Sequence, residues 1–299
     1  MDFDPTHWAA AAARVGLRAL GRLWGRDVML YTGGVSFFAL LAAFPALAIV
    51  LGLYSLLVSP AEAAEKASTF AAILPGNAQT LFQGELQRLS HAPPKAVSLQ
   101  SVVALLIGLY AAHRGIKALI AGLSFIHEED APQGFFGFNI MAFLILVAAL
   151  ILMSILSGVF FGVRLLATTL HLEPLRGVHW FYSEWTWASL GVTLGLTLIY
   201  RFAMSTKPVG WRASTAGGIA AATLSLAASW GSAFYVTTFA HFGAMYGSIA
   251  AVVVLLIWLS WTVNALFYGA ALATEIELLE MGKPTLSDAI KRLRSDPSS

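Results

Sequence analysis

The sequence predicts an all-α, polytopic membrane protein: a bundle of six transmembrane helices with an amphipathic helix at its N-terminal end. Hydrophobic residues make up 58% of the 299-residue chain and charged residues only 11%, too few to cover a globular protein in water. Apolar stretches as long as the roughly 20 residues that cross a bilayer also recur along the chain. The connections between them are too short to bury a core of their own, so we expect one membrane domain.

The N-terminal segment, residues 1–34, contains four arginines at helical spacing. Arg14, Arg18, Arg22 and Arg26 are four residues apart and form one stripe of a helix, while apolar residues form another. An amphipathic helix of this kind lies in the membrane interface, with its arginines at anionic lipid headgroups. A nucleic-acid-binding patch is the alternative, but a stripe that leads directly into a membrane span more often meets lipid. We therefore expect no nucleic-acid partner.

Six segments follow as expected membrane spans. Four are long and uniformly apolar, the fourth in chain order is shorter, and the second is apolar only up to Ala112, before Arg114 and Lys117 interrupt it. The expected spans cover residues 35–58, 98–126, 138–163, 185–203, 213–239 and 246–274. Residues 35–274 therefore form the membrane domain, and residues 275–299 form a tail.

The distribution of basic residues predicts the orientation of the chain. The N-terminal segment, the second and fourth connections and the tail hold 13 of the 18 Lys and Arg residues, and the other connections hold five. Basic connections remain on the cytoplasmic side of a membrane. Both termini should therefore be cytoplasmic.

Small residues recur every four positions in three of the spans. The fifth span carries the longest such ridge, made of Ala213, Gly217, Ala221, Ser225, Ser229 and Ala233. Shorter ridges occur at Ser154, Gly158 and Gly162 and at Ala265, Gly269 and Ala273. Helices in lipid associate through close packing at small residues. We expect a compact bundle in which neighbouring helices approach the fifth span closely.

Charged residues at the expected cytoplasmic ends of the spans are the candidate binding site. Arg114 and Lys117 are three residues apart and share a helix face. They either extend to the headgroups, the more common arrangement, or face a cavity and bind an anionic group such as a lipid phosphate. Arg201 ends the fourth span and Arg212 opens the fifth. They either anchor these helix ends at the cytoplasmic side of the membrane or form a basic ring together with Arg114 and Lys117. Glu275 and Glu277 close the sixth span on different faces of the helix. One of them is a candidate to pair with a cytoplasmic arginine, and a proton-coupling role is the alternative; Glu275 is the candidate site residue.

Signatures of catalysis and of cofactor binding are missing from the sequence. There is no cysteine, which excludes thiolate metal sites and cysteine nucleophiles. None of the seven histidines stands three or four residues from another, and no phosphate-binding glycine loop occurs. We therefore expect no catalytic centre, no metal, no cofactor and no ATPase activity.

Four short motifs occur at the spans. They are Phe44-Pro45 in the first, His113-Arg114-Gly115 in the second, and Tyr246-Gly247-Ser248 and Leu256-Ile257-Trp258 in the sixth. These residues resemble the YihY/BrkB family, and the resemblance extends over roughly residues 20–280. It implies a bacterial inner-membrane protein with six spans and both termini inside, which agrees with the distribution of basic residues.

The end of the sixth span departs from that family's pattern. Here Gly269-Ala270-Ala271-Leu272-Ala273 stands in place of the family's usual Gly-Ala-Glu-Leu-Asn. Any role of the missing carboxylate is in doubt in this chain or has passed to Glu275. Family members have been labelled ribonuclease BN or virulence factor, but phosphodiester hydrolysis needs metal ligands or acid and base groups. The sequence shows no cluster of such groups.

Two functions of different classes fit these observations. The first is a flippase-like carrier of an anionic envelope lipid or related amphiphile, which enters at a basic cytoplasmic surface and moves without nucleotide hydrolysis. The second is a non-transporting scaffold whose small-residue ridges bind partner helices or a second copy of the chain. A membrane-bound hydrolase is the least favoured class. In each case membrane lipids are the expected surroundings and partners.

Overall fold

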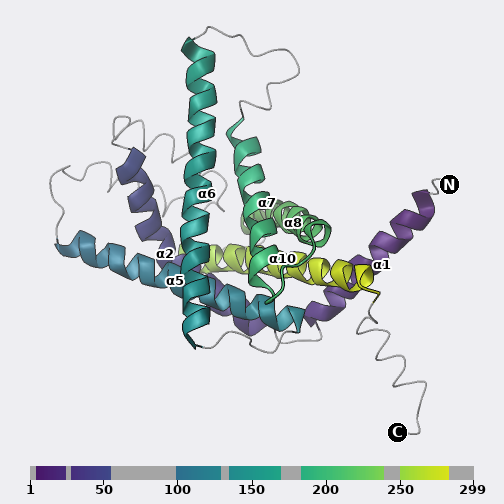
Figure 1. The fold of residues 1–299 in the computed structure, drawn as a ribbon. Coiled ribbons are helices and arrows are strands. Elements are labelled where there is room, and N and C mark those ends of the chain that lie inside the picture. Colours follow the sequence, from purple (N-terminus) through teal and green to yellow (C-terminus); the bar gives the residue numbers. More distant parts are fainter. Residues whose placement is uncertain are drawn as a thin grey trace. The chain divides into compact units, whose positions relative to one another are not determined.

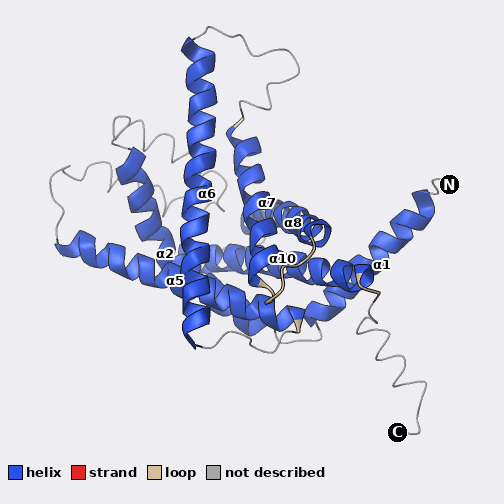
Figure 2. Ribbon diagram, viewed as in Figure 1, coloured by secondary structure: helices blue, strands red, loops and turns tan. Residues whose placement is uncertain are grey.

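The computed structural model describes residues 5–24, 28–54, 99–128, 135–169, 183–238 and 250–282. Within these ranges the regular structure is entirely helical, with seven helices and no strand (Figure 1, Figure 2). The helices are α1 (Pro5–Trp24), α2 (Met29–Tyr54), α5 (Leu99–His127), α6 (Phe135–Thr169), α7 (Glu184–Ala203), α8 (Trp211–Thr238) and α10 (Ala250–Glu280). The predicted all-α class is confirmed for this part of the chain.

Each of the six expected spans overlaps one of these helices, and residues 55–58 of the first and 246–249 of the sixth lie outside the described residues. α2 begins before the first expected span, and α10 continues to Glu280, so the expected tail begins within a helix. Three segments of the described residues are long and apolar enough to cross a membrane, namely Leu105–His127, Phe136–Phe160 and Val252–Glu280. They overlap the second, third and sixth expected spans. The count of six stays a prediction.

The described helices belong to two compact units, which we treat separately. Unit 1 comprises Met1–Val28, Ile120–Thr223 and Leu266–Ser299, and unit 2 comprises Met29–Leu119 and Leu224–Ala265. α1, α6 and α7 therefore belong to unit 1 and α2 belongs to unit 2. The remaining helices, α5, α8 and α10, each contribute residues to both.

In unit 1, α8 packs between α7 and α10 through glycines. A Cβ atom on Gly269 of α10 would lie 2.6 Å from Cβ of Ala221 and 2.6 Å from the carbonyl oxygen of Gly217. On the neighbouring face of α8, a Cβ atom on Gly218 would lie 2.5 Å from Oγ1 of Thr197 in α7. Only glycine permits such close approach, because any side chain would overlap the facing helix. The close packing predicted for the small-residue ridge of α8 is confirmed here.

α6 packs against α7 with its leucines and not with its small residues. Leu152 and Leu156 point at Gly195 and Gly191 of α7, where an added Cβ atom would lie 3.6 and 2.8 Å from a leucine methyl carbon. A Cβ atom on Gly158, in the ridge predicted for α6, would meet nothing within 4 Å. Positions two residues apart lie on nearly opposite sides of a helix, so a face that presents Leu156 to α7 turns Gly158 away. Among the described residues this ridge is therefore not a packing surface.

In unit 2, α2 and α5 form an antiparallel pair. The contacting residues are Gly34 with Ala118, Phe38 with Gly115, and Pro45 with Gly108. Residue numbers rise along α2 as they fall along α5, which makes the helices antiparallel. A Cβ atom on Gly108 would overlap the Pro45 ring, with Cγ only 2.7 Å away. Glycine at this position makes room for a proline that α2 carries within its length.

Replacing Gly269 by alanine tests the close contact between α8 and α10. The new methyl group would overlap the α8 backbone and Ala221, so we expect the free energy of unfolding to fall by about 1–3 kcal/mol. The measurement is thermal or denaturant unfolding of the purified full chain in detergent.

Gly158→Ala is the matched control for this substitution. Its methyl group meets open space among the described residues, and alanine favours a helix over glycine by about 1 kcal/mol. We expect this variant to be at least as stable as the wild type. Equal stability of Gly269→Ala and Gly158→Ala would contradict the contact.

Candidate functional site

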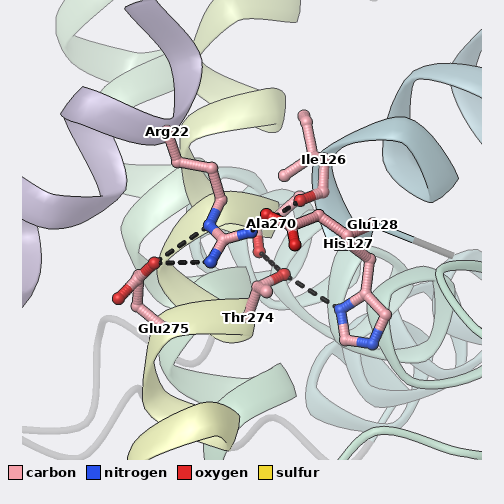
Figure 3. Close-up of polar contacts among 7 residues, drawn as sticks. All are labelled: Arg22, Ile126, His127, Glu128, Ala270, Thr274 and Glu275. Carbon is pink, nitrogen blue, oxygen red and sulfur yellow. Dashed lines mark hydrogen bonds and ion pairs between the residues drawn. The ribbon is translucent and has the colours of Figure 1, made fainter. Parts of the chain in front are cut away.

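Unit 1 contains a buried arginine that joins three helices. Arg22 lies in the last turn of α1, and its side chain is only 3% exposed. Its Nε and Nη2 atoms donate hydrogen bonds of 2.9 and 2.8 Å to Oε1 of Glu275 in α10 (Figure 3). The Glu275 side chain is also 3% exposed. The two residues therefore form a buried ion pair with charge-assisted hydrogen bonds.

The same guanidinium group binds the C-terminal end of α5. Nη1 of Arg22 donates to the carbonyl oxygen of Ile126 at 3.1 Å and to Oε1 of Glu128 at 2.8 Å (Figure 3). The last carbonyl groups of a helix lack partners within the helix, so a basic side chain stabilises this end. Glu128 follows α5 with a left-handed φ of 64° and a side chain that is 41% exposed. Arg22 thus caps α5 while it pairs with α10.

His127, beside this contact, lies between two groups that accept hydrogen bonds. Its Nδ1 is 3.1 Å from Oγ1 of Thr274, and that hydroxyl group donates to the carbonyl oxygen of Ala270 at 3.0 Å (Figure 3). Nδ1 is therefore the donor in its contact with Thr274. On the other side of the ring, Nε2 faces Oε2 of Glu277 at 3.6 Å. A doubly protonated ring would satisfy both contacts.

These charged groups form one cluster, which we call the Arg22 cluster: Arg22, His127, Glu128, Glu275 and Glu277. It holds three carboxyl groups, one guanidinium group and one imidazole ring. Oε2 of Glu275 is buried and accepts no hydrogen bond within the described part of the chain. Leaving a buried acceptor unsatisfied costs about 1–3 kcal/mol, and more for a charged group.

Among the residues predicted from the sequence, Glu275 belongs to the Arg22 cluster and pairs with Arg22. Arg201 places its guanidinium carbon 4.2 Å from the centroid of a Trp211 ring and donates from Nη1 to the carbonyl oxygen of Val209 at 2.6 Å. These contacts close the turn between α7 and α8. Arg212 is exposed in the first turn of α8.

The other two predicted residues belong to unit 2. Arg114 is exposed, and its guanidinium carbon lies 5.5 Å from the centroid of the Phe38 ring. Lys117 is half-buried on the same helix. A basic ring of Arg114, Lys117, Arg201 and Arg212 would draw on both units, so it stays a prediction.

Sequence reasoning did not identify Arg22, His127 or Glu128 as site residues. Arg22 belongs to a stripe of arginines at four-residue spacing. Such a stripe predicts contact with lipid, so it gave no indication that Arg22 is buried. His127 and Glu128 follow an apolar stretch, where charged residues commonly end a membrane span. The one available signal in the sequence was the small residue Ala19, about one turn before Arg22 on the same face of α1, which the structure shows to be fully buried.

Comparisons with known proteins identify relatives of this chain. A model of the family described as Virulence factor BrkB matches residues 19–291. A protein of Bacillus subtilis (strain 168) that is named as ribonuclease-like, YfkH, is 25% identical over 230 residues, which cover 75% of this chain and 81% of that protein. No solved structure matches the chain. The family match includes every residue of the Arg22 cluster.

Substitution of Arg22 tests its structural role. Arg22→Gln leaves Glu275 buried without a cation, and we expect the free energy of unfolding to fall by about 3–5 kcal/mol. The double variant Arg22→Met with Glu275→Leu should recover much of this loss, because neither charge remains to be compensated. The measurement is denaturant unfolding in mixed micelles.

Arg18→Gln, one turn earlier on α1, is the control for the loss of one positive charge. Arg18 is half-buried, without the buried ion pair of Arg22, so we expect a smaller change in stability, of about 1 kcal/mol or less. A loss in Arg22→Gln no larger than in Arg18→Gln would show that the buried pair does not hold α1 in place.

Proposed function

Because the chain belongs to the Virulence factor BrkB family, we propose that it is an inner-membrane carrier of an anionic envelope lipid or related amphiphile. The family match covers most of the chain, and three of its described helices are apolar enough to cross a membrane. In this proposal the carrier works without nucleotide hydrolysis of its own. It needs no cofactor, and its partners are membrane lipids.

The proposed topology has six spans, with both termini in the cytoplasm and α1 at the membrane interface. α1 presents large apolar side chains outward, with Leu17 68% and Trp24 85% exposed. Exposed tryptophan and leucine beside arginines suit the boundary between headgroups and acyl chains. The excess of basic residues at the termini and in the second and fourth connections supports their cytoplasmic location.

The observation that carries the proposed cargo is the position of Arg114. It lies within Leu105–His127, a segment apolar enough to cross a membrane, and yet its side chain is exposed. An arginine within a span needs an anionic or aqueous partner. Its planar guanidinium group fits two phosphate oxygens at once, and Lys117, about one turn later, adds a second positive charge.

We assign no catalytic activity to the chain in this proposal. The ribonuclease-like name belongs to the Bacillus protein. In the described ranges of this chain, no set of three or more His, Cys, Asp or Glu side chains is placed to hold a metal ion. The acidic and basic groups of the Arg22 cluster are engaged with one another. Their pairing supports a structural or ion-binding role for that cluster.

A non-transporting scaffold is the second candidate function, and one observation favours it. Among the described residues, an added Cβ atom on Gly158 or Gly162 of α6 would meet nothing within 4 Å. Large apolar side chains of the same helix, including Phe136 and Met153, are also exposed. A helix with small residues on an open face suits a partner helix or a second copy of the chain in the membrane.

Lipid retention distinguishes the two candidates. The experiment is native mass spectrometry of the full chain extracted with its surrounding membrane, comparing wild type with the double variant Arg114→Glu, Lys117→Glu. We expect the wild type to retain one class of anionic lipid selectively. The double variant should lose most of it, because reversed charges repel a phosphate group.

The single variant Arg114→Glu is measured as well, and Lys207→Glu is its matched control. It makes the same change of charge at an exposed residue between α7 and α8, outside the proposed site. Unselective retention of bulk lipid by the wild type would contradict the carrier and favour the scaffold. Equal selective retention by wild type and double variant would contradict the assignment of Arg114 and Lys117.

The absence of cysteine makes the proposed topology directly testable. A single cysteine in place of Lys207 should be protected from a membrane-impermeant maleimide in intact spheroplasts, because the fourth connection is cytoplasmic. A cysteine in place of Gln83, in the first connection, should be labelled. Permeabilised cells, in which both react, are the control. Labelling of Lys207→Cys in intact spheroplasts would show that the fourth connection lies outside the cell, which is the opposite of the proposed orientation.

A further inference from the structure

We propose that Phe38 is a positioning residue for Arg114: its ring holds the guanidinium group so that the N–H donors of that group face an anionic headgroup. Phe38 lies on α2 and Arg114 on α5, both in unit 2. This deepens the proposed carrier, because it specifies how the same site selects its cargo, and it rests on the proposed function.

The first observation is that the donors of Arg114 are unused. The ring of Phe38 lies against this side chain, with its centroid 5.5 Å from the guanidinium carbon. Within the described ranges Arg114 forms neither a side-chain hydrogen bond nor an ion pair. It nevertheless lies in Leu105–His127, a segment apolar enough to cross a membrane, where a cation needs an anionic or aqueous partner. Its N–H donors are therefore available to a ligand.

Two other arginines show how such a group looks when it stabilises the fold. Arg22 donates hydrogen bonds from every nitrogen atom of its guanidinium group. Arg201 lies against the ring of Trp211, but its Nη1 also donates to a backbone carbonyl oxygen and closes a turn. Arg114 has the aromatic contact without such an acceptor among the described residues. Its contact with Phe38 is therefore suited to hold the group for a ligand.

The second observation is that packing fixes the place of Phe38. A Cβ atom on Gly115, the residue after Arg114, would lie 3.3 Å from Cβ of Phe38 and 3.9 Å from the backbone nitrogen of Ala39. The ring of Phe37 stands edge-on to that of Phe38, with centroids 5.2 Å apart and an angle of 73° between the planes. Aromatic pairs favour this arrangement. Backbone contact and a second ring thus hold Phe38 beside Arg114.

The chemistry of this contact explains how it assists binding. An aromatic ring attracts a guanidinium group through the negative face of its π system, which requires no N–H donor. The donors of the planar group remain at its edges, where two of them match two oxygens of one phosphate. A side chain that is ordered before the ligand arrives also loses less entropy on binding. Removal of the ring should therefore weaken binding although the charge of Arg114 remains.

The same arrangement favours a net anionic headgroup over a zwitterionic one. A quaternary ammonium group binds to the face of an aromatic ring, but Arg114 already lies over the ring of Phe38. Lys117, about one turn later on α5, adds a second positive charge. A headgroup with a cation of its own would be repelled by both. The ligand class is therefore an amphiphile that carries a phosphate group and no ammonium group.

A native mass spectrometry titration of the delipidated full chain in detergent tests the role of Phe38. The probe is dioctanoyl phosphatidylglycerol, compared with dioctanoyl phosphatidylcholine and with inorganic phosphate. We expect the wild type to bind phosphatidylglycerol more tightly than either comparison ligand. Equal or tighter binding of inorganic phosphate would show a site for the free anion and overturn the amphiphile, and equal binding of phosphatidylcholine would overturn the selection against zwitterions.

Three variants separate the ring from its bulk. Phe38→Leu, which loses the ring and stays apolar, should bind phosphatidylglycerol about 5- to 30-fold more weakly. Phe38→Tyr keeps the ring and should bind as the wild type does. Phe143→Leu makes the same change at an exposed phenylalanine of α6 and is the matched control. Phe38→Met, another apolar side chain without a ring, replaces Phe38→Leu if that variant does not fold.

A double-mutant cycle distinguishes positioning from general damage to the helix pair. Arg114→Gln removes the group that Phe38 holds, so adding Phe38→Leu to it should cause little further loss of phosphatidylglycerol binding. Losses that add in the double variant would overturn the positioning role. Equal selective binding by wild type and Phe38→Leu would also overturn it and would leave the carrier intact.

A measurement without lipid separates this inference from the carrier. In the chain labelled with [¹⁵N]arginine, the Nε–H resonance of Arg114 is the one that Arg114→Gln removes. We expect Phe38→Leu to shift this resonance, because the ring current of Phe38 is lost, and Phe143→Leu to leave it in place. An unchanged resonance in Phe38→Leu would overturn the contact. A shifted resonance together with unselective lipid binding by the wild type would support the contact and overturn the carrier.

Discussion

The position of α1 depends on the hydrogen bonds that the guanidinium group of Arg22 donates. Hydrogen bonds from this one side chain reach α5 and α10 at once. Two large apolar residues of α1, Leu17 and Trp24, face outward and so contribute little to its attachment. A hydrogen bond from the Tyr268 hydroxyl to the carbonyl oxygen of Gly16 adds one further polar contact. In poorly solvated surroundings such bonds are not exchanged for bonds to water, so they specify one position for the helix.

Close backbone packing explains why Glu275 is held firmly enough to serve as the partner of Arg22. The segment of α10 that precedes it contains Ala270, Ala271 and Ala273, all fully buried, and Gly269 in contact with the α8 backbone. Small residues let neighbouring helices approach until their backbones touch, and this fixes the direction of every side chain in the next turn. The polar cluster therefore depends on an apolar contact one to two turns away.

The sequence was sufficient to predict the helices and the close packing of the α8 ridge at Gly217 and Ala221. Both depend on local periodicity. The sequence was not sufficient to predict the partner of Glu275, because a stripe of arginines reveals one face of a helix and not what lies against that face. For the same reason the small-residue ridge on α6 predicted packing that the described residues do not show. Leu152 and Leu156, on the opposite side of α6, contact the glycines of α7. Arg201 was predicted as a candidate binding residue. Its guanidinium group lies against the ring of Trp211, a contact that forms only when α8 turns back beside α7.

The pairing of α2 with α5 has a mechanical consequence. The ring of Pro45 occupies the space that Gly108 leaves by having no side chain, and Phe38 lies in the same way against Gly115. If one helix slid past the other by a single turn, Ala112 would stand where Gly108 stands, and its methyl group would collide with the proline ring. A shear of one turn between these two helices would therefore meet a steric clash. The proline and the two glycines thus fix the register in which α2 and α5 pack together.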